Sequence, residues 1–188
     1  MNQDDRRLIA DTLAGRTAAY GDLVRRYQDR LFNTVVRVVD NPDDAHDIVQ
    51  ETFVSAYVSL GSFKGESEFY TWLYRIAFNT AVSWRRKRRP MVSLDAGRDV
   101  DSPAHPQDCS DVADPGATLE RTEEATRLRT ALARLSPEHR EVLVLKDIDG
   151  LKYEEIADVA GIPIGTVRSR IHRARLELRD LLESGGGE

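Results

Sequence analysis

The chain is poor in cysteine and in long apolar runs, and each shortage excludes a class of protein. Cys109 is the only cysteine among 188 residues, so an internal disulfide and a cysteine-rich metal cluster are both excluded. No apolar run approaches the roughly 20 residues of a transmembrane helix. The first residues also lack the apolar segment of a secretory signal peptide. We therefore expect a cytoplasmic protein without membrane insertion.

Sequence patterns that are typical of catalysis or cofactor binding are missing as well. The four histidines are scattered, and none stands at metal-ligand spacing from a cysteine or a carboxylate pair. There is no glycine-rich phosphate loop and no nucleophile motif. The sequence therefore predicts a protein that is not an enzyme, with no catalytic residues, no metal and no cofactor.

The chain also lacks the basic excess that is usual in proteins that bind DNA by themselves. Its formal net charge is −5, whereas phosphate contacts normally come from a clear surplus of lysine and arginine. Positive charge is gathered in two segments, the run from Arg85 to Arg89 and the arginines from Arg168 to Arg175. We expect such a chain to bind DNA weakly alone and to need a partner.

Helical periodicity is present over nearly the whole chain, and no alternating strand pattern stands out. In the N-terminal half, helices are expected over about 4–14, 17–39, 42–60 and 67–88. Asn41 and Pro42 form a typical helix start, because asparagine accepts hydrogen bonds from the first turn and proline needs no donor there. In the C-terminal half, helical pattern resumes at Leu119, and Ser136 begins a further helix.

Between these halves the composition changes. The stretch from Pro90 to Gly116 holds several prolines and six aspartates but few large apolar residues, which is typical of an extended linker. The expected fold is therefore all-α, with two small helical domains over 1–89 and 119–183. A flexible acidic linker over 90–118 joins them, and a disordered tail over 184–188 follows.

The C-terminal domain contains a pattern typical of a helix-turn-helix. After a first helix, Gly161 can adopt the positive φ of a sharp turn. Val167 and Ile171 then form an apolar stripe under an arginine-rich second helix, which is how a recognition helix is presented to the major groove. The residues expected on its DNA face are Thr166, Arg168, Ser169, His172 and Arg173. The alternative is an ordinary helical hairpin with a solvated basic face.

Two surfaces of the N-terminal domain allow a structural or a functional interpretation. The helix over 42–60 has a second face of acids and an amide, which is either a solvated acidic face or a docking surface for a basic partner helix. The segment 63–79 is dense in aromatics, and we expect one or more of Phe63, Tyr70, Tyr74 and Phe78 to stay exposed. With Asn79 these rings would capture unstacked bases, while the run from Arg85 to Arg89 holds the backbone. The alternative is core packing with one stray ring.

Three motifs, taken together with the helices between them, span nearly the whole chain outside the acidic stretch and the glycine-rich tail. They are Asp44-Ala-His-Asp-Ile-Val-Gln-Glu-Thr-Phe53, Phe69-Tyr-Thr-Trp-Leu-Tyr-Arg-Ile-Ala-Phe-Asn79, and Tyr153-Glu-Glu-Ile-Ala157 with Gly165-Thr-Val-Arg-Ser-Arg-Ile-His-Arg-Ala-Arg175. With the helices between them, they resemble the bacterial RNA polymerase sigma factors of the extracytoplasmic-function group.

This resemblance implies a non-enzymatic transcription initiation factor and a role for each surface. The residues that would dock on the coiled-coil clamp of core RNA polymerase are Asp44, Asp47, Gln50 and Glu51. Those that would read and melt the minus-ten element of promoter DNA are Phe63, Tyr70, Asn79, Arg85, Arg86 and Arg88. The helix-turn-helix residues given above would read the minus-thirty-five element as duplex.

The resemblance also implies partners and one local departure. Family members are commonly held by an anti-sigma factor, and the free chain would be a monomer, active in a stress or envelope response. Lys152 stands where many relatives place a capping serine or threonine, a loss of about 1 kcal/mol in helix stability. The alternative function is a stand-alone dimeric helix-turn-helix regulator, which would bind a palindrome without polymerase.

Overall fold

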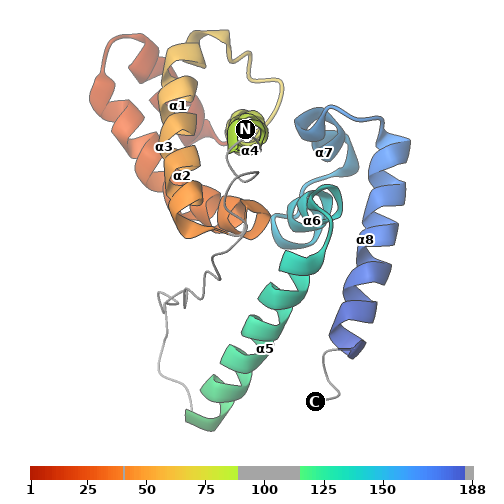
Figure 1. Cartoon of the computed structure of the whole chain (residues 1–188). Coiled ribbons are helices and arrows are strands. Elements are labelled where there is room, and N and C mark those ends of the chain that lie inside the picture. The colour runs from red at the N-terminus through yellow and green to blue at the C-terminus, as the bar shows by residue number, and fades with distance from the viewer. Residues whose placement is uncertain (40, 89–114, 185–188) are drawn as a thin grey trace.

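The computed structural model describes residues 1–39, 41–88 and 115–184, and over these residues the chain forms helices and no strands (Figure 1). The predicted all-α fold with two helical domains is therefore confirmed. Most of the predicted linker and tail lies outside the described residues, as does Cys109. No helix in the described part of the chain is both long and apolar enough to cross a membrane.

The N-terminal domain consists of four helices and one short turn. These are α1 (Gln3–Leu13), α2 (Thr17–Val39), α3 (Pro42–Ser59), the 3-10 turn η1 (Leu60–Ser62) and α4 (Phe69–Arg88). The start of α3 is as predicted, since the Asn41 side chain accepts hydrogen bonds from the N–H groups of Asp43 and Asp44. Helix α4 begins at Phe69, slightly later than the sequence suggests.

The apolar faces of these helices meet in a core around α2, which contacts α1, α3 and α4. Leu23, Leu31 and Leu73 are fully buried there. A buried carboxylate ties α1 to α2, because Asp5 accepts hydrogen bonds from Arg26 at 2.7 Å and from the Tyr27 hydroxyl at 2.6 Å.

The C-terminal domain contains α5 (Pro115–Arg134), α6 (Pro137–Leu143), a π-helical turn η3 (Val144–Ile148), α7 (Tyr153–Ala160) and α8 (Ile164–Ser184). Helix α5 begins four residues before Leu119, inside the predicted linker. Ser136 caps α6 as predicted, accepting from the N–H of His139. Helix α8 runs beside both α5 and α6 (Figure 1), and Leu132, Leu135, Leu143 and Ala174 form a small core there.

The two domains pack directly against each other. Helix α7 lies against α4, while α6 and η3 contact α2 (Figure 1). Buried residues of both domains, such as Tyr74 on α4 and Val142 on α6, belong to one continuous apolar cluster. The domains therefore share a core although the sequence suggests two separate modules.

Candidate nucleic-acid and protein interfaces

The helix-turn-helix forms as the sequence predicts. Gly161 closes α7 with a φ of 64°, in the left-handed region that favours glycine. The N–H of Ile162 donates to the Ala157 carbonyl at 3.1 Å and tightens the turn. Since nothing lies within 4 Å of a Cβ built at Gly161, the backbone conformation rather than space requires glycine.

The N-terminus of α7 shows how the chain manages without a capping hydroxyl. The Lys152 backbone N–H donates to the Glu155 carboxylate at 2.8 Å, which is the reciprocal half of a capping box. Glu155 Oε1 also accepts from Thr71 on α4 at 3.4 Å. One carboxylate thus supports both the first turn of α7 and its contact with the other domain.

Helix α8 presents the predicted recognition face. Val167, Ile171 and Ala174 are buried under it, which turns the opposite side to solvent. Of the five predicted DNA-face residues, four are exposed and Thr166 is half-buried; the exposed ones are Arg168, Ser169, His172 and Arg173. The predicted grouping of these side chains on one accessible face is therefore present.

The arginines of α8 divide into two sets that the sequence does not distinguish. Arg170 pairs with Glu138 at 2.7 Å. Arg175 makes two hydrogen bonds to Asp147, at 3.0 and 2.6 Å, and this pairing raises the pKa of the Arg175 guanidinium. By contrast, Arg168 and Arg173 form no ion pair with any residue that the structure describes. Only this second set has its charge available for a ligand.

The acidic face of α3 is accessible and continues into an apolar strip. Asp47, Gln50 and Glu51 are exposed and Asp44 is half-buried. One turn further on, Val54 is 66% and Val58 82% exposed. Val58 was not among the residues expected on this face, although it follows Val54 by four positions and therefore lies on the same side of the helix. Acids, an amide and two aliphatics on one face are a composition suited to a protein interface.

Tyr70 and Tyr74 of the aromatic segment are buried, which contradicts the expectation that they could remain exposed. They are 4% and 2% exposed, because the C-terminal domain covers this side of α4. Phe63 is half-buried, with its ring 5.0 Å from that of Trp72. Phe78 is also half-buried, and Asn79 is exposed. The Arg85, Arg86 and Arg88 backbone continues α4, but their side chains lie outside the described ones.

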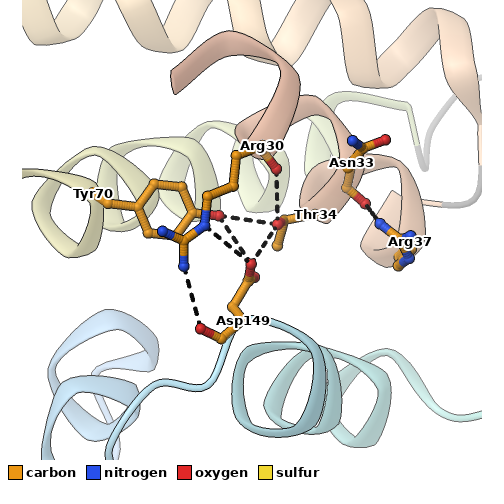
Figure 2. A network of polar contacts seen from close by, with 6 residues as sticks. All are labelled: Arg30, Asn33, Thr34, Arg37, Tyr70 and Asp149. Carbon is orange, nitrogen blue, oxygen red and sulfur yellow. Dashed lines mark hydrogen bonds and ion pairs between the residues drawn. The ribbon is translucent and has the colours of Figure 1, made fainter. Parts of the chain in front are cut away.

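A polar network surrounds Tyr70 where the domains meet (Figure 2). Asp149, which follows η3, has a side chain that is only 5% exposed. Its Oδ1 atom accepts from the Thr34 hydroxyl at 3.0 Å and from the Tyr70 hydroxyl at 3.2 Å. The Arg30 guanidinium lies 3.8 Å from the Tyr70 ring centroid and donates to the Asp149 carbonyl at 3.2 Å. Sequence reasoning missed Asp149, because no local pattern marks it.

The described residues contain no group of histidine, cysteine, aspartate and glutamate that could hold a metal ion. The described residues present an exposed basic face on α8, an acidic and apolar face on α3, and an exposed amide on α4. These surfaces are suited to binding other macromolecules.

Comparison with known proteins gives two family matches. Residues 23–90 match the model of sigma-70 region 2, and residues 125–178 match the model of sigma-70 region 4. The first match runs from within α2 past the end of α4, and the second runs from within α5 to within α8. Each domain thus has its own counterpart.

Individual relatives are similar over almost the whole chain. The RNA polymerase sigma-H factor of Pseudomonas aeruginosa is 38% identical over 92% of this chain and 91% of its own. The ECF RNA polymerase sigma factor SigW of Bacillus subtilis is 36% identical, over 93% and 94%. Among solved structures, the sigma factor RpoE of Bartonella quintana, in complex with the anti-sigma factor NepR, has a TM-score of 0.71 at 29% identity. That match covers 87% of this chain and 96% of RpoE.

Proposed function

The chain belongs to the extracytoplasmic-function group of sigma-70 RNA polymerase sigma factors, and from this premise we propose how its surfaces direct promoter recognition. It is a transcription initiation factor of the kind that serves stress or envelope responses. Sigma factors are initiation factors rather than enzymes, and we extend this to the chain itself: it acts in the cytoplasm and has no catalytic activity of its own.

The observation that carries the proposal is the face of α8. Arg168 and Arg173 are exposed without ion pairs among the described residues, beside Ser169 and His172. Arginine and histidine in the major groove donate to the acceptor atoms of base edges. We assign this face, with Thr166 at its edge, to the minus-thirty-five element as duplex DNA.

The acidic and apolar face of α3 is assigned to core polymerase. Asp47, Gln50 and Glu51 offer charge and hydrogen-bonding groups to a basic helix, with Asp44 at the N-terminal end of the face. Val54 and Val58 add an apolar contact that excludes water at the edge of the interface. The clamp of the largest polymerase subunit is the partner that the family resemblance indicates.

The minus-ten element is assigned to α4 and the loop before it. Asn79 is exposed and offers an amide to a base edge, while Phe63, in the loop before α4, supplies an aromatic surface for an unstacked base. Arg85, Arg86 and Arg88 follow along the same helix and would contact the phosphates. Tyr70 can take part only if the C-terminal domain moves away from α4.

An anti-sigma factor is the further partner that we propose. The structure of the similar RpoE contains a bound anti-sigma factor. In this chain, the exposed apolar side chains of Val54 and Val58 on α3 offer a contact surface for such a partner. We expect the free chain to be monomeric.

In vitro transcription with core polymerase and a library of genomic fragments tests the proposal. Core polymerase with the chain should initiate at a set of fragments that share two sequence elements at a constant spacing. Core polymerase alone should not initiate at these fragments. The chain by itself should bind the same fragments weakly, because its net charge is −5. Tight binding to a palindrome without polymerase, or no affinity for core polymerase, would contradict the proposal and favour the stand-alone regulator.

A further inference from the structure

One carboxylate on the acidic face of α3 is held by a side chain from α4. The indole Nε1–H of Trp84 donates a hydrogen bond to Glu51 Oε2 at 3.0 Å. Trp84 lies near the C-terminal end of α4, and its ring is half-buried against the main apolar cluster. Glu51 itself is exposed. Packing therefore fixes the donor, while the carboxylate that it holds faces solvent.

The position of Glu51 on α3 explains why α4 can reach it. Residues three and four apart lie on the same side of a helix. Glu51 follows the exposed Asp47 by four positions and the buried Ile48 by three. It therefore stands at the border between the exposed face of α3 and the side that packs against α4.

We propose that Trp84 is a positioning residue for core polymerase, because its indole N–H orients the Glu51 carboxylate before a basic partner helix docks on α3. The inference rests on the function proposed above, since it takes core polymerase as the partner of this face. Trp84 acts through Glu51 rather than through a contact of its own with the partner.

The chemistry of the donor suits this role. An indole N–H is a neutral donor, so it fixes the direction of the carboxylate without cancelling its negative charge. Glu51 forms no ion pair with a side chain that the structure describes. A carboxylate has lone pairs for several donors. The charge of Glu51 and its Oε1 atom are therefore available to a lysine or arginine of the partner.

Glu51 differs in this respect from its polar neighbours on the face. Neither Asp47 nor Gln50 forms a side-chain hydrogen bond or ion pair with another residue in the described part of the chain. Their side chains can adjust to a partner, whereas Glu51 presents an anion in a fixed direction. Glu51 therefore sets the point at which a cation of the partner is bound.

This orientation affects docking more than it affects the free domain. A glutamate that becomes ordered only at an interface loses rotamer freedom on binding, which lowers the affinity. In this chain, part of that ordering precedes the partner. Burial at the interface also removes the water that competes for the hydrogen bond between Trp84 and Glu51, and this strengthens the bond.

A double-mutant cycle on the affinity of the full-length chain for core polymerase tests the inference. Trp84→Phe keeps an aromatic ring but removes the N–H donor, and Glu51→Ala removes the acceptor. Trp72→Phe is the matched control, because Trp72 is the only other tryptophan and is also half-buried on α4. Its indole donates no hydrogen bond to a residue that the structure describes. Circular dichroism confirms that each variant keeps its helices.

We expect Trp84→Phe to weaken core binding by roughly three- to ten-fold, the range for ordering one flexible side chain at an interface. Trp72→Phe should leave the affinity near wild type. The effects of the pair should not add, because Trp84→Phe has little left to change once Glu51→Ala has removed the carboxylate. If Trp84→Phe does not fold, benzothienylalanine at position 84 replaces the N–H by sulfur and keeps the shape of the ring.

Nuclear magnetic resonance of the free chain tests the hydrogen bond without polymerase. The two tryptophans give two indole N–H signals, and Trp72→Phe assigns them. A hydrogen bond to a carboxylate deshields the donated proton. Glu51→Ala should therefore move the Trp84 signal upfield and leave the Trp72 signal in place.

The outcomes separate this inference from the proposed function. Wild-type affinity for core polymerase in Trp84→Phe, or additive effects in the cycle, would overturn the positioning role. An unmoved Trp84 signal in Glu51→Ala would overturn the hydrogen bond itself. If the wild-type chain has no affinity for core polymerase, the proposed function is wrong, while the Trp84 signal still shows whether the Glu51 carboxylate is held.

Discussion

Individual side chains of α8 differ in availability more than their sequence suggests. Arg168 and Arg173 are exposed and without ion pairs among the described residues, whereas Arg170 and Arg175 are held by Glu138 and Asp147. Substitution of Arg168 or Arg173 should therefore weaken DNA binding without destabilising the domain. The second pair stabilises the domain itself.

Arg173→Glu should remove most of the dependence on the minus-thirty-five element. One lost base contact is worth about 1–3 kcal/mol, and the new acid also repels phosphate. Promoter binding with core polymerase, measured on wild-type and element-scrambled fragments, should show nearly equal affinities for the variant. Arg179→Glu, on the last turns of the same helix, should retain the discrimination. If the Arg173→Glu variant still prefers the wild-type fragment over the scrambled one, the assignment of the DNA face on α8 is wrong.

Tyr20 gives a pH-dependent prediction. Its hydroxyl donates to the Phe53 carbonyl at 2.5 Å, and burial raises its pKa to about 12 from 10.0. The phenol form therefore stabilises the fold below pH 10, and this contribution is lost as the pH rises from about 10 to 12. Tyr20→Phe should cost about 1 kcal/mol at pH 8. Urea denaturation should show that the difference from wild type shrinks above pH 10; a constant difference would contradict this.

At the scale of single helices, the predictable features were those with local signals. Asn41 with Pro42, Ser136 and Gly161 mark helix ends through their own backbone and side-chain chemistry, and the structure has each where expected. The buried and exposed sides of α8 were also predictable, from the spacing of its apolar residues. The π-helical turn η3 did not, because its backbone geometry leaves no distinct mark in the periodicity.

The two glycines that flank the turn before α8 should respond oppositely to alanine. Gly161→Ala forces a side chain into the left-handed region and should destabilise by about 1–2 kcal/mol. Gly165 lies inside α8 with nothing within 4 Å of an added Cβ, so Gly165→Ala should be neutral or gain up to about 1 kcal/mol. Thermal denaturation of both variants checks this, and equal effects would contradict it.

The outer face of α3 should act as one docking surface. Asp47→Ala with Gln50→Ala should weaken the affinity for core polymerase by roughly ten-fold or more, as expected for loss of about 1–2 kcal/mol in interface hydrogen bonds. Asp22→Ala with Gln28→Ala removes an exposed acid and amide from α2 instead and should leave affinity near wild type. A core-binding titration that finds the two double variants alike would remove this assignment.

At the scale of the whole molecule, the sequence predicted the two domains but not their contact. Tyr70 and Asp149 are 79 positions apart, and Asp149 stands directly before Gly150 in a segment whose sequence looks like a solvent-exposed loop. No periodicity links such residues, so the burial of Tyr70 and the role of Asp149 could come only from tertiary structure. The same holds for Thr71 and Glu155.

Because the domains share one apolar cluster, the wild-type chain should unfold in a single calorimetric transition. Asp149→Arg uncouples the domains and should give two transitions, or one with a van't Hoff enthalpy well below the calorimetric enthalpy. Asp180→Arg should unfold like the wild type. Two transitions in the wild type would show that the shared core contributes little.

The division of the α8 arginines into paired and unpaired side chains also determines how strongly the affinity for DNA depends on salt concentration. Each phosphate neutralised by a protein cation releases condensed counterions, with a slope of about −0.9 in log affinity against log salt. With only Arg168 and Arg173 available, the minus-thirty-five contact should displace few of them. The affinity of this contact for duplex DNA would then change little as the potassium concentration rises.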